Sequence, residues 1–135
     1  MNNSQLIECA LKARKKAYCP YSGFAVGAAL LCGDGSVYTG CNIENSAFSP
    51  TNCAERTAFF KAVSEGKREF LKIAVVGGDL EKSPENYCPP CGVCRQVMKE
   101  FCNGNFEILI AKDSDDYKIM TLFELLPESF DKREV

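Results

Sequence analysis

The sequence predicts an α/β fold in which a mixed five-stranded sheet lies between two layers of helices, a three-layer α/β/α arrangement. Segments with apolar residues at helical spacing alternate with short apolar runs that end at glycine, proline or aspartate. Two of these runs flank the turn Gly33-Asp34-Gly35, which is typical of a β-hairpin. Residues 53 to 111 read as helix, strand, helix, strand, which favours two parallel strands joined by a right-handed crossover. Helices then cover both faces of the sheet.

The N-terminal segment is predicted to be a helix that Ser4 caps and that ends before Pro20. Its apolar side would pack on the sheet, and Arg14 is expected on the solvated side together with three lysines. A turn over residues 18–23 leads into the hairpin. The hairpin strands are predicted over Ala25–Leu31 and Val37–Ile43.

Glycine and proline mark most ends of the later elements. Glycine favours helix C-termini, and proline interrupts helices. The predicted order is helix, strand, surface loop, helix, strand, short strand and helical turn. These elements are expected over residues 53–65, 70–78, 79–88, 92–102, 106–111, 117–120 and 123–126.

Length and composition limit the classes of function that the chain can have. A chain of 135 residues predicts a single domain over residues 1–135. A net charge of −2 without a basic run argues against a nucleic-acid partner. No apolar stretch approaches the roughly 18 residues of a membrane span, so no membrane partner is expected. The start of the chain reads as an amphipathic segment and not as a signal peptide, so we expect a cytoplasmic protein.

The chain has nine cysteines and no histidine. Because the number is odd, the cysteines cannot all pair within the chain. In a reducing compartment, metal ligands and small buried residues are the better interpretation. Five of them lie in apolar segments without ligand spacing and are expected only to pack; they are Cys9, Cys19, Cys32, Cys41 and Cys102.

Two motifs carry candidate chemistry. Cys53 precedes the carboxylate of Glu55 by two residues, and Cys91 precedes Cys94 by three. Three thiolates can hold one Zn²⁺ and leave its fourth position open to water, and a carboxylate beside that water can move protons. Both motifs precede predicted helices, whose N-terminal dipoles favour negative charge. We expect Arg56 to donate hydrogen bonds to ligand sulfurs and to offset their excess charge.

Three alternatives compete with this interpretation. Cys88 could complete a closed four-sulfur zinc site, although Pro89 and Pro90 stiffen its link to Cys91. Cys88 and Cys91 could instead form a redox dithiol. The cysteines could also merely pack. A polar cluster at the end of the second hairpin strand, Asn42 to Asn45, is either a ligand contact or a solvated turn.

The metal motif resembles that of the zinc nucleoside and nucleobase deaminases. Further segments extend the resemblance over about residues 6–130 and point to cytidine deaminases of the small homotetrameric, three-cysteine class. These segments are Pro20–Leu30, Gly40–Asn45, Cys53–Ala58, Gly92–Gln96 and Glu124–Pro127. The chain departs from the pattern at Pro89, at Phe48, where a tyrosine is common, and in a long loop over residues 79–88.

The resemblance implies an enzyme of pyrimidine salvage that hydrolyses cytidine and 2′-deoxycytidine to uridine and 2′-deoxyuridine, with release of ammonia. One Zn²⁺ per subunit would be bound by Cys53, Cys91 and Cys94. Glu55 would carry protons from water to N3 of the pyrimidine and to the leaving ammonia. The substrate would contact Phe24, Asn42, Glu44, the backbone amide of Ala54 and Phe130 of a neighbouring subunit in a homotetramer.

Two other functions remain open at this stage. A deaminase of an aminonucleoside antibiotic such as blasticidin S shares the three-cysteine motif, although the Asn42–Asn45 run favours an ordinary nucleoside. A non-catalytic, zinc-stabilised module would show four sulfurs on the metal, whereas the enzyme would show three and a water.

Overall fold

Five strands form one mixed sheet in the order β2-β1-β3-β4-β5 in the computed structural model, which describes residues 1–132. Only β3 and β4 run parallel, as predicted, and every other neighbouring pair is antiparallel. The strands are β1 (Phe24–Cys32), β2 (Val37–Cys41), β3 (Phe70–Asp79), β4 (Glu107–Asp113) and β5 (Asp116–Thr121). The helices are α1 (Asn3–Arg14), α2 (Ala54–Ser64), α3 (Gly92–Phe101) and α4 (Leu122–Leu125).

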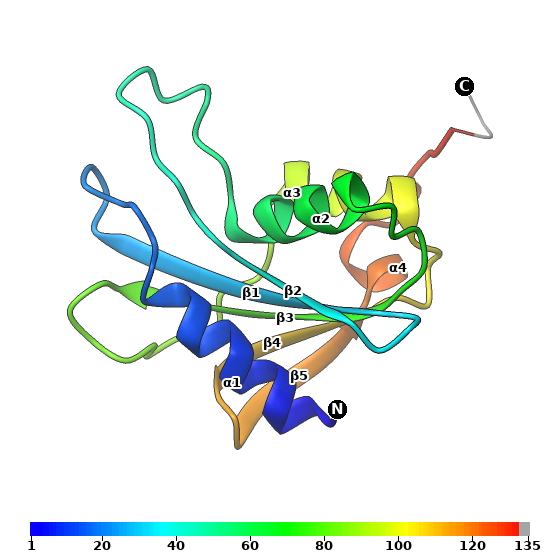
Figure 1. Ribbon diagram of the computed structural model, residues 1–135, viewed down its shortest axis with the longest axis horizontal. Helices are drawn as coiled ribbons and strands as arrows, with labels where there is room; N and C mark the ends of the chain where they lie inside the picture. Colours follow the sequence, from blue (N-terminus) through cyan, green and yellow to red (C-terminus); the bar gives the residue numbers. More distant parts are fainter. Residues whose placement is uncertain (133–135) are drawn as a thin grey trace.

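The predicted three-layer architecture is confirmed. Figure 1 shows α1 on one face of the sheet and α2 with α3 on the other. Leu6, Ile7 and Ala10 of α1 join one core cluster, whereas Phe59 of α2 and Met98 of α3 join a second one. Alternate residues of each central strand serve the two clusters, as the period of a strand requires. Within residues 1–132, no helix is long and apolar enough to cross a membrane.

The predicted cap of the first helix was wrong, whereas its predicted end before Pro20 is confirmed. The cap is Asn2 and not Ser4: the side chain of Asn2 accepts from the backbone of Gln5, and the side chain of Gln5 accepts from the backbone of Asn2. This reciprocal pair satisfies two backbone donors, which makes Asn2 the better cap. The hydroxyl of Ser4 instead donates to the carbonyl of Ser114. The helix ends at Arg14, well before Pro20.

The predicted exposure of Arg14 was also wrong. Only 9% of Arg14 is exposed, and its guanidinium donates to the carbonyls of Ala25, Asp79 and Lys82. A long arginine in the last turn of a helix can carry its polar end past the apolar stem to distant backbone acceptors. Arg14 therefore ties α1 to β1 and to the start of the long loop after β3.

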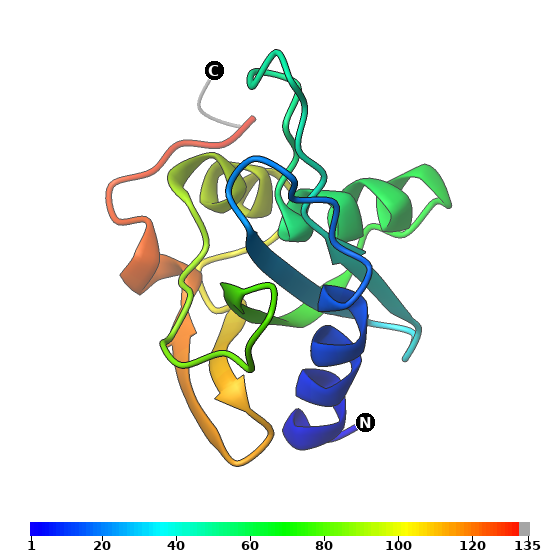
Figure 2. The ribbon, with the colours of Figure 1, turned by 90° about the vertical axis from the view of Figure 1, so that its left-hand side faces the viewer.

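Gly40 in β2 allows α2 to pack closely on the face of the sheet opposite α1. A Cβ atom at Gly40 would lie 2.3 Å from the carbonyl oxygen of Ala54 and 2.7 Å from the amide nitrogen of Ala58. The backbone of α2 can therefore rest directly on the strand only because position 40 has no side chain. This close approach brings the N-terminus of α2 to one end of the sheet. Figure 2 looks onto that end, where the turn after α1 and the connections β2–α2 and β3–α3 come together.

Candidate metal centre

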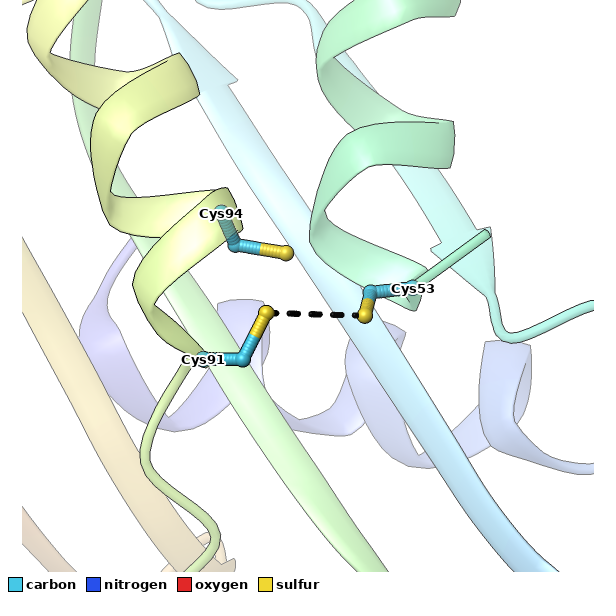
Figure 3. A group of neighbouring side chains, drawn as sticks. All are labelled: Cys53, Cys91 and Cys94. Carbon is cyan, nitrogen blue, oxygen red and sulfur yellow. Dashed lines mark hydrogen bonds between the residues drawn. The ribbon is translucent and has the colours of Figure 1, made fainter. Parts of the chain in front are cut away.

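Three predicted ligands meet at the N-termini of α2 and α3. Cys53 and Cys91 are the N-cap residues of these helices, and Cys94 lies in the first turn of α3. Their sulfur atoms all lie within 4.8 Å of one another. Figure 3 shows the three side chains pointing toward one another from the starts of the two helices. The sulfurs of Cys53 and Cys91 are 3.8 Å apart. Two sulfurs that bind one tetrahedral Zn²⁺ at about 2.3 Å are separated by about 3.8 Å, so the spacing fits zinc.

The cluster lies in a field that favours negative charge. Both helix N-termini point their partial positive charge at the sulfurs. Hydrogen bonding from Cys94, from Arg56 and from Cys91 lowers the pKa of Cys53 to about 5, against the opposing effect of burial. The pKa of Cys94 is raised, because its thiol donates to the Cys53 thiolate. Deprotonated thiols are what a zinc ion needs, and the lowered pKa of Cys53 favours its thiolate.

The guanidinium of Arg56 occupies the place expected for it. Its Nη2 atom donates to the sulfur of Cys53 at 3.2 Å. Its Nε atom is buried and has no partner among the described residues. A cation held against a ligand sulfur offsets the net negative charge that three thiolates leave on a zinc site.

Glu55 lies in the first turn of α2, one residue inside the helix start, and is 4% exposed. Burial raises the pKa of its carboxyl to about 7, and the nearby charge of Cys53 adds to this effect. Hydrogen bonding from Cys94 opposes it. The spacing of two between Cys53 and Glu55 works because Cys53 caps the helix, so both side chains reach the cluster from the helix end. A buried carboxyl with this pKa can both accept and release a proton near neutral pH.

Cys88 stands apart from the cluster. Among residues 1–132, the group of thiols and carboxylates within metal-binding distance consists of Cys53, Cys91 and Cys94 alone. Burial raises the pKa of Cys88 to about 11, with smaller contributions from the charges of Glu55 and Cys53. The position of Cys88 outside the cluster therefore argues against the closed zinc site in which it would be the fourth sulfur ligand.

Asn42 and Glu44 are tied to the chain's own backbone. The buried amide of Asn42 accepts from Val26 N–H and donates to the Phe24 carbonyl, both at 2.8 Å. The carboxylate of Glu44 accepts from the backbone N–H groups of Tyr21 and Ser22 at 2.9 and 3.1 Å. The two side chains hold the turn before β1 in place. Their contact with a ribose stays a prediction.

The other predicted contacts are spread over the molecule. Phe24 begins β1 and is 44% exposed at the same end of the sheet. Ala54 is buried and opens α2, where backbone N–H groups have no partner within the helix. Phe130 follows α4 and is 57% exposed, and its carbonyl accepts a hydrogen bond from Gln96.

The sequence did not predict the roles of two supporting residues. Arg95 donates to the carbonyls of Pro90 and Leu125 and so fixes the segment that carries Cys91. The hydroxyl of Thr57 lies within hydrogen-bond distance of the carbonyls of Cys41 and Cys53. Each residue follows a capping cysteine by four positions, one helical turn later. That shared spacing is the signal that could have found them.

Known proteins resemble the chain along its length. A family model of the cytidine and deoxycytidylate deaminase zinc-binding region matches residues 1–109. A cytidine deaminase of Sporosarcina psychrophila is 52% identical over 135 residues, which covers 100% of this chain and 96% of that protein. A probable cytidine deaminase of Dictyostelium discoideum is 44% identical over 139 residues, covering 100% and 90%.

Solved structures agree with these relatives. The crystal structure of cytidine deaminase from Burkholderia pseudomallei has a TM-score of 0.88 and 45% identity, covering 96% of this chain and 100% of that one. The enzyme from Mycobacterium tuberculosis has a TM-score of 0.79 and 38% identity, covering 93% and 94%. With its sheet, its three-thiol cluster and these similarities over almost every residue, the chain belongs to the cytidine deaminase family.

Proposed function

We propose that the protein hydrolyses cytidine and 2′-deoxycytidine to uridine and 2′-deoxyuridine and releases ammonia. The observation that carries this proposal is a buried carboxyl, Glu55, beside three thiols whose spacing fits a zinc ion. The names of the relatives from Sporosarcina psychrophila and Burkholderia pseudomallei point to the same reaction.

The chemistry divides between the metal and the carboxyl. Zinc held by Cys53, Cys91 and Cys94 supplies a Lewis acid that lowers the pKa of water. Glu55 takes the proton that the attacking water loses as its oxygen bonds to C4 of the pyrimidine. It gives that proton to ring N3. It then takes the remaining proton from the C4 hydroxyl as the carbonyl forms, and passes it to the amino group as the C4–N bond breaks, so that one water is consumed and one ammonia released. Burial of Glu55 keeps bulk water away from these transfers.

Four side-chain or backbone groups would hold the nucleoside. The N–H of Ala54 suits the pyrimidine carbonyl, because it lies at the start of α2, where N–H groups have no acceptor within the helix. The half-exposed ring of Phe24 offers an apolar surface to the base. Asn42 keeps one amide hydrogen beyond its bond to Phe24, and the carboxylate of Glu44 has further lone pairs for ribose hydroxyls. A pair of ribose contacts favours a nucleoside over a free base.

We further propose a cytosolic homotetramer that serves pyrimidine salvage. The exposed ring of Phe130 is available to a neighbouring subunit, where it would stack on the base. All nine cysteines are unpaired, which suits a reducing compartment.

The decisive experiment mixes the zinc-loaded protein with cytidine and follows both the loss of cytosine absorbance and the release of ammonia. Stoichiometric conversion to uridine supports the proposal. Turnover of blasticidin S without turnover of cytidine would assign the antibiotic instead. No reaction with either compound, in protein with a full complement of zinc, would leave a non-catalytic zinc module.

A further inference from the structure

We propose that the missing side chain of Gly77 creates a slot for the Cys88 thiol, which holds this fourth sulfur off the metal and makes it a wall of the nucleoside pocket. The inference rests on the proposed function, because it assigns a positioning role within the same site. Neither residue belongs to the ligand set or to the proton carrier.

The contact geometry around Gly77 defines the slot. A Cβ atom built on Gly77 would lie 2.7 Å from the sulfur of Cys88 and 3.1 Å from both the Cys88 Cβ and the Cε1 atom of Phe24. Real Cβ atoms do not approach a neighbour to less than 3.0 Å. The space that a side chain at position 77 would need is therefore filled by Cys88 and by the edge of the Phe24 ring.

The slot opens on the face of the sheet that carries the metal cluster. Gly77 of β3 pairs with Val26 of β1, and Val26 packs against the core beneath α2 and α3. Burial is the main cause that raises the pKa of Cys88, and the charges of Glu55 and Cys53 add to it. Cys88 thus lies beside Phe24, on the face of the sheet that carries the metal cluster.

Without such a slot, the sequence spacing of Cys88 would be compatible with binding to the metal. Cys88, Cys91 and Cys94 are spaced as in a chelating motif, and a fourth thiolate would close the position where water must bind. Pro89 and Pro90 work against chelation, since proline and the residue before it favour extended backbone. An extended segment of this length separates the Cα atoms of Cys88 and Cys91 by about 9 Å.

The slot supplies the second restraint, because it gives the thiol a packed position to occupy. Both the Cys88 sulfur and a Phe24 ring carbon border the same point, so they lie less than about 6 Å apart, within the range of sulfur–aromatic contacts. A protonated thiol there adds apolar surface next to Glu55 and supports the ring that would face the pyrimidine. Position 77 therefore sets where Phe24 and Cys88 stand relative to the substrate.

A double-mutant cycle over Gly77→Ala and Cys88→Ala tests the proposal. Gly77→Ala should displace the thiol and lower kcat/KM by roughly 10- to 100-fold, as small misplacements in active sites do. Cys88→Ala should raise KM by about 2- to 10-fold, the value of a lost sulfur–aromatic contact. In the double variant, the defect of Gly77→Ala should largely disappear, because the displaced sulfur is gone.

Cobalt substitution provides a readout that needs no turnover. In Co²⁺-loaded Gly77→Ala, the thiolate-to-cobalt absorption should rise above that of the wild type and return to it in the double variant. An unchanged cobalt spectrum in Gly77→Ala, or a kinetic defect that Cys88→Ala does not relieve, overturns the proposal. If the wild type failed to deaminate cytidine, the proposed function would fall while the cobalt spectra still decided whether Gly77 keeps Cys88 off the metal.

Alkylation of the wild-type zinc protein covers the case in which Gly77→Ala does not fold. Bound uridine should slow the reaction of Cys88 with iodoacetamide about tenfold, the effect of burying a pocket wall under a ligand at well above its Kd. Cys102, whose pKa burial raises to about 12, is the matched control and should keep its rate. Equal rates at Cys88 with and without uridine, in protein shown to bind uridine, would contradict the assigned wall.

Discussion

Arg14 and Glu55 are two buried charged side chains on opposite faces of the same sheet, and their surroundings differ. Arg14 is 9% exposed and its guanidinium donates to three backbone carbonyls. Glu55 is 4% exposed and faces the thiols of the cluster, where burial raises its pKa to about 7. A buried cation that donates to three backbone carbonyls joins the segments that carry them. A buried acid whose charged form is disfavoured is ready to exchange protons.

Replacing Glu55 should give the largest effect of all. Glu55→Gln keeps the shape of the side chain and removes proton transfer, so kcat should fall by about 10²- to 10⁴-fold while zinc content and unfolding stay unchanged. Steady-state kinetics and metal analysis measure both. Glu100→Gln is the control, since Glu100 is exposed on α3, and its activity should match the wild type. Full activity of Glu55→Gln would mean that another group carries the proton.

Replacing Arg14 should affect stability and spare chemistry. Arg14→Met leaves the carbonyls of Ala25, Asp79 and Lys82 without their donors, which should cost about 2–4 kcal/mol of unfolding free energy. Urea titration of the variant measures the loss, with Lys15→Met at the exposed neighbouring position as the control. Unchanged stability together with lost turnover would reverse the roles assigned to the two buried charges.

Removing Arg56 should weaken the metal site by an intermediate amount. Arg56→Ala loses the hydrogen bond to the Cys53 sulfur, so zinc affinity should fall by about 10- to 100-fold in competition with a chelator. Arg68→Ala is a suitable control, because Arg68 donates only to the carbonyls of Val63 and Lys67 among the described residues. Equal affinity in wild type and Arg56→Ala would show that the guanidinium does not support the sulfurs.

The smallest predicted effect is the pH-dependent contribution of Glu44 to the stability of the folded state. Hydrogen bonds from Ser22 and from the Tyr21 backbone hold the pKa of Glu44 below its ordinary value of 4.5. Its carboxylate therefore stabilises the folded state above pH 4.5, and this contribution is lost as the pH falls through the lowered pKa. Urea midpoints of wild type and Glu44→Gln should differ at pH 7 and converge as the pH falls below the lowered pKa of Glu44. A gap that widened in acid would be inconsistent with this pairing.

The sequence predicted best what local rules determine. The turn at residues 33–35 and the alternation after residue 53 were enough to predict the hairpin, the parallel pair and the layers. The burial of Arg14 was missed because helical periodicity records only which way a side chain starts, not how far an arginine reaches. Ser4 was chosen as cap by residue type, whereas the Asn2–Gln5 pair satisfies two donors.

The site residues divide in the same way, into those that a local motif predicts and those that it does not. Cys53, Glu55, Cys91 and Cys94 were predicted because their spacing carries the chemistry within two short segments. The contacts of Arg95 with Leu125 and of Gly77 with Cys88 join segments distant in sequence, so no local pattern reveals them. The polar pairings of Asn42 with β1 likewise depend on how the strand end folds back.

X-ray absorption at the zinc edge of the fully loaded wild-type protein distinguishes an open three-sulfur site from a closed one. A zinc ion bound by Cys53, Cys91, Cys94 and water should show three sulfur neighbours at about 2.3 Å and one lighter oxygen or nitrogen neighbour at about 2.0 Å. Four sulfur neighbours would contradict the open site, because Cys88 would then occupy the position at which water must bind.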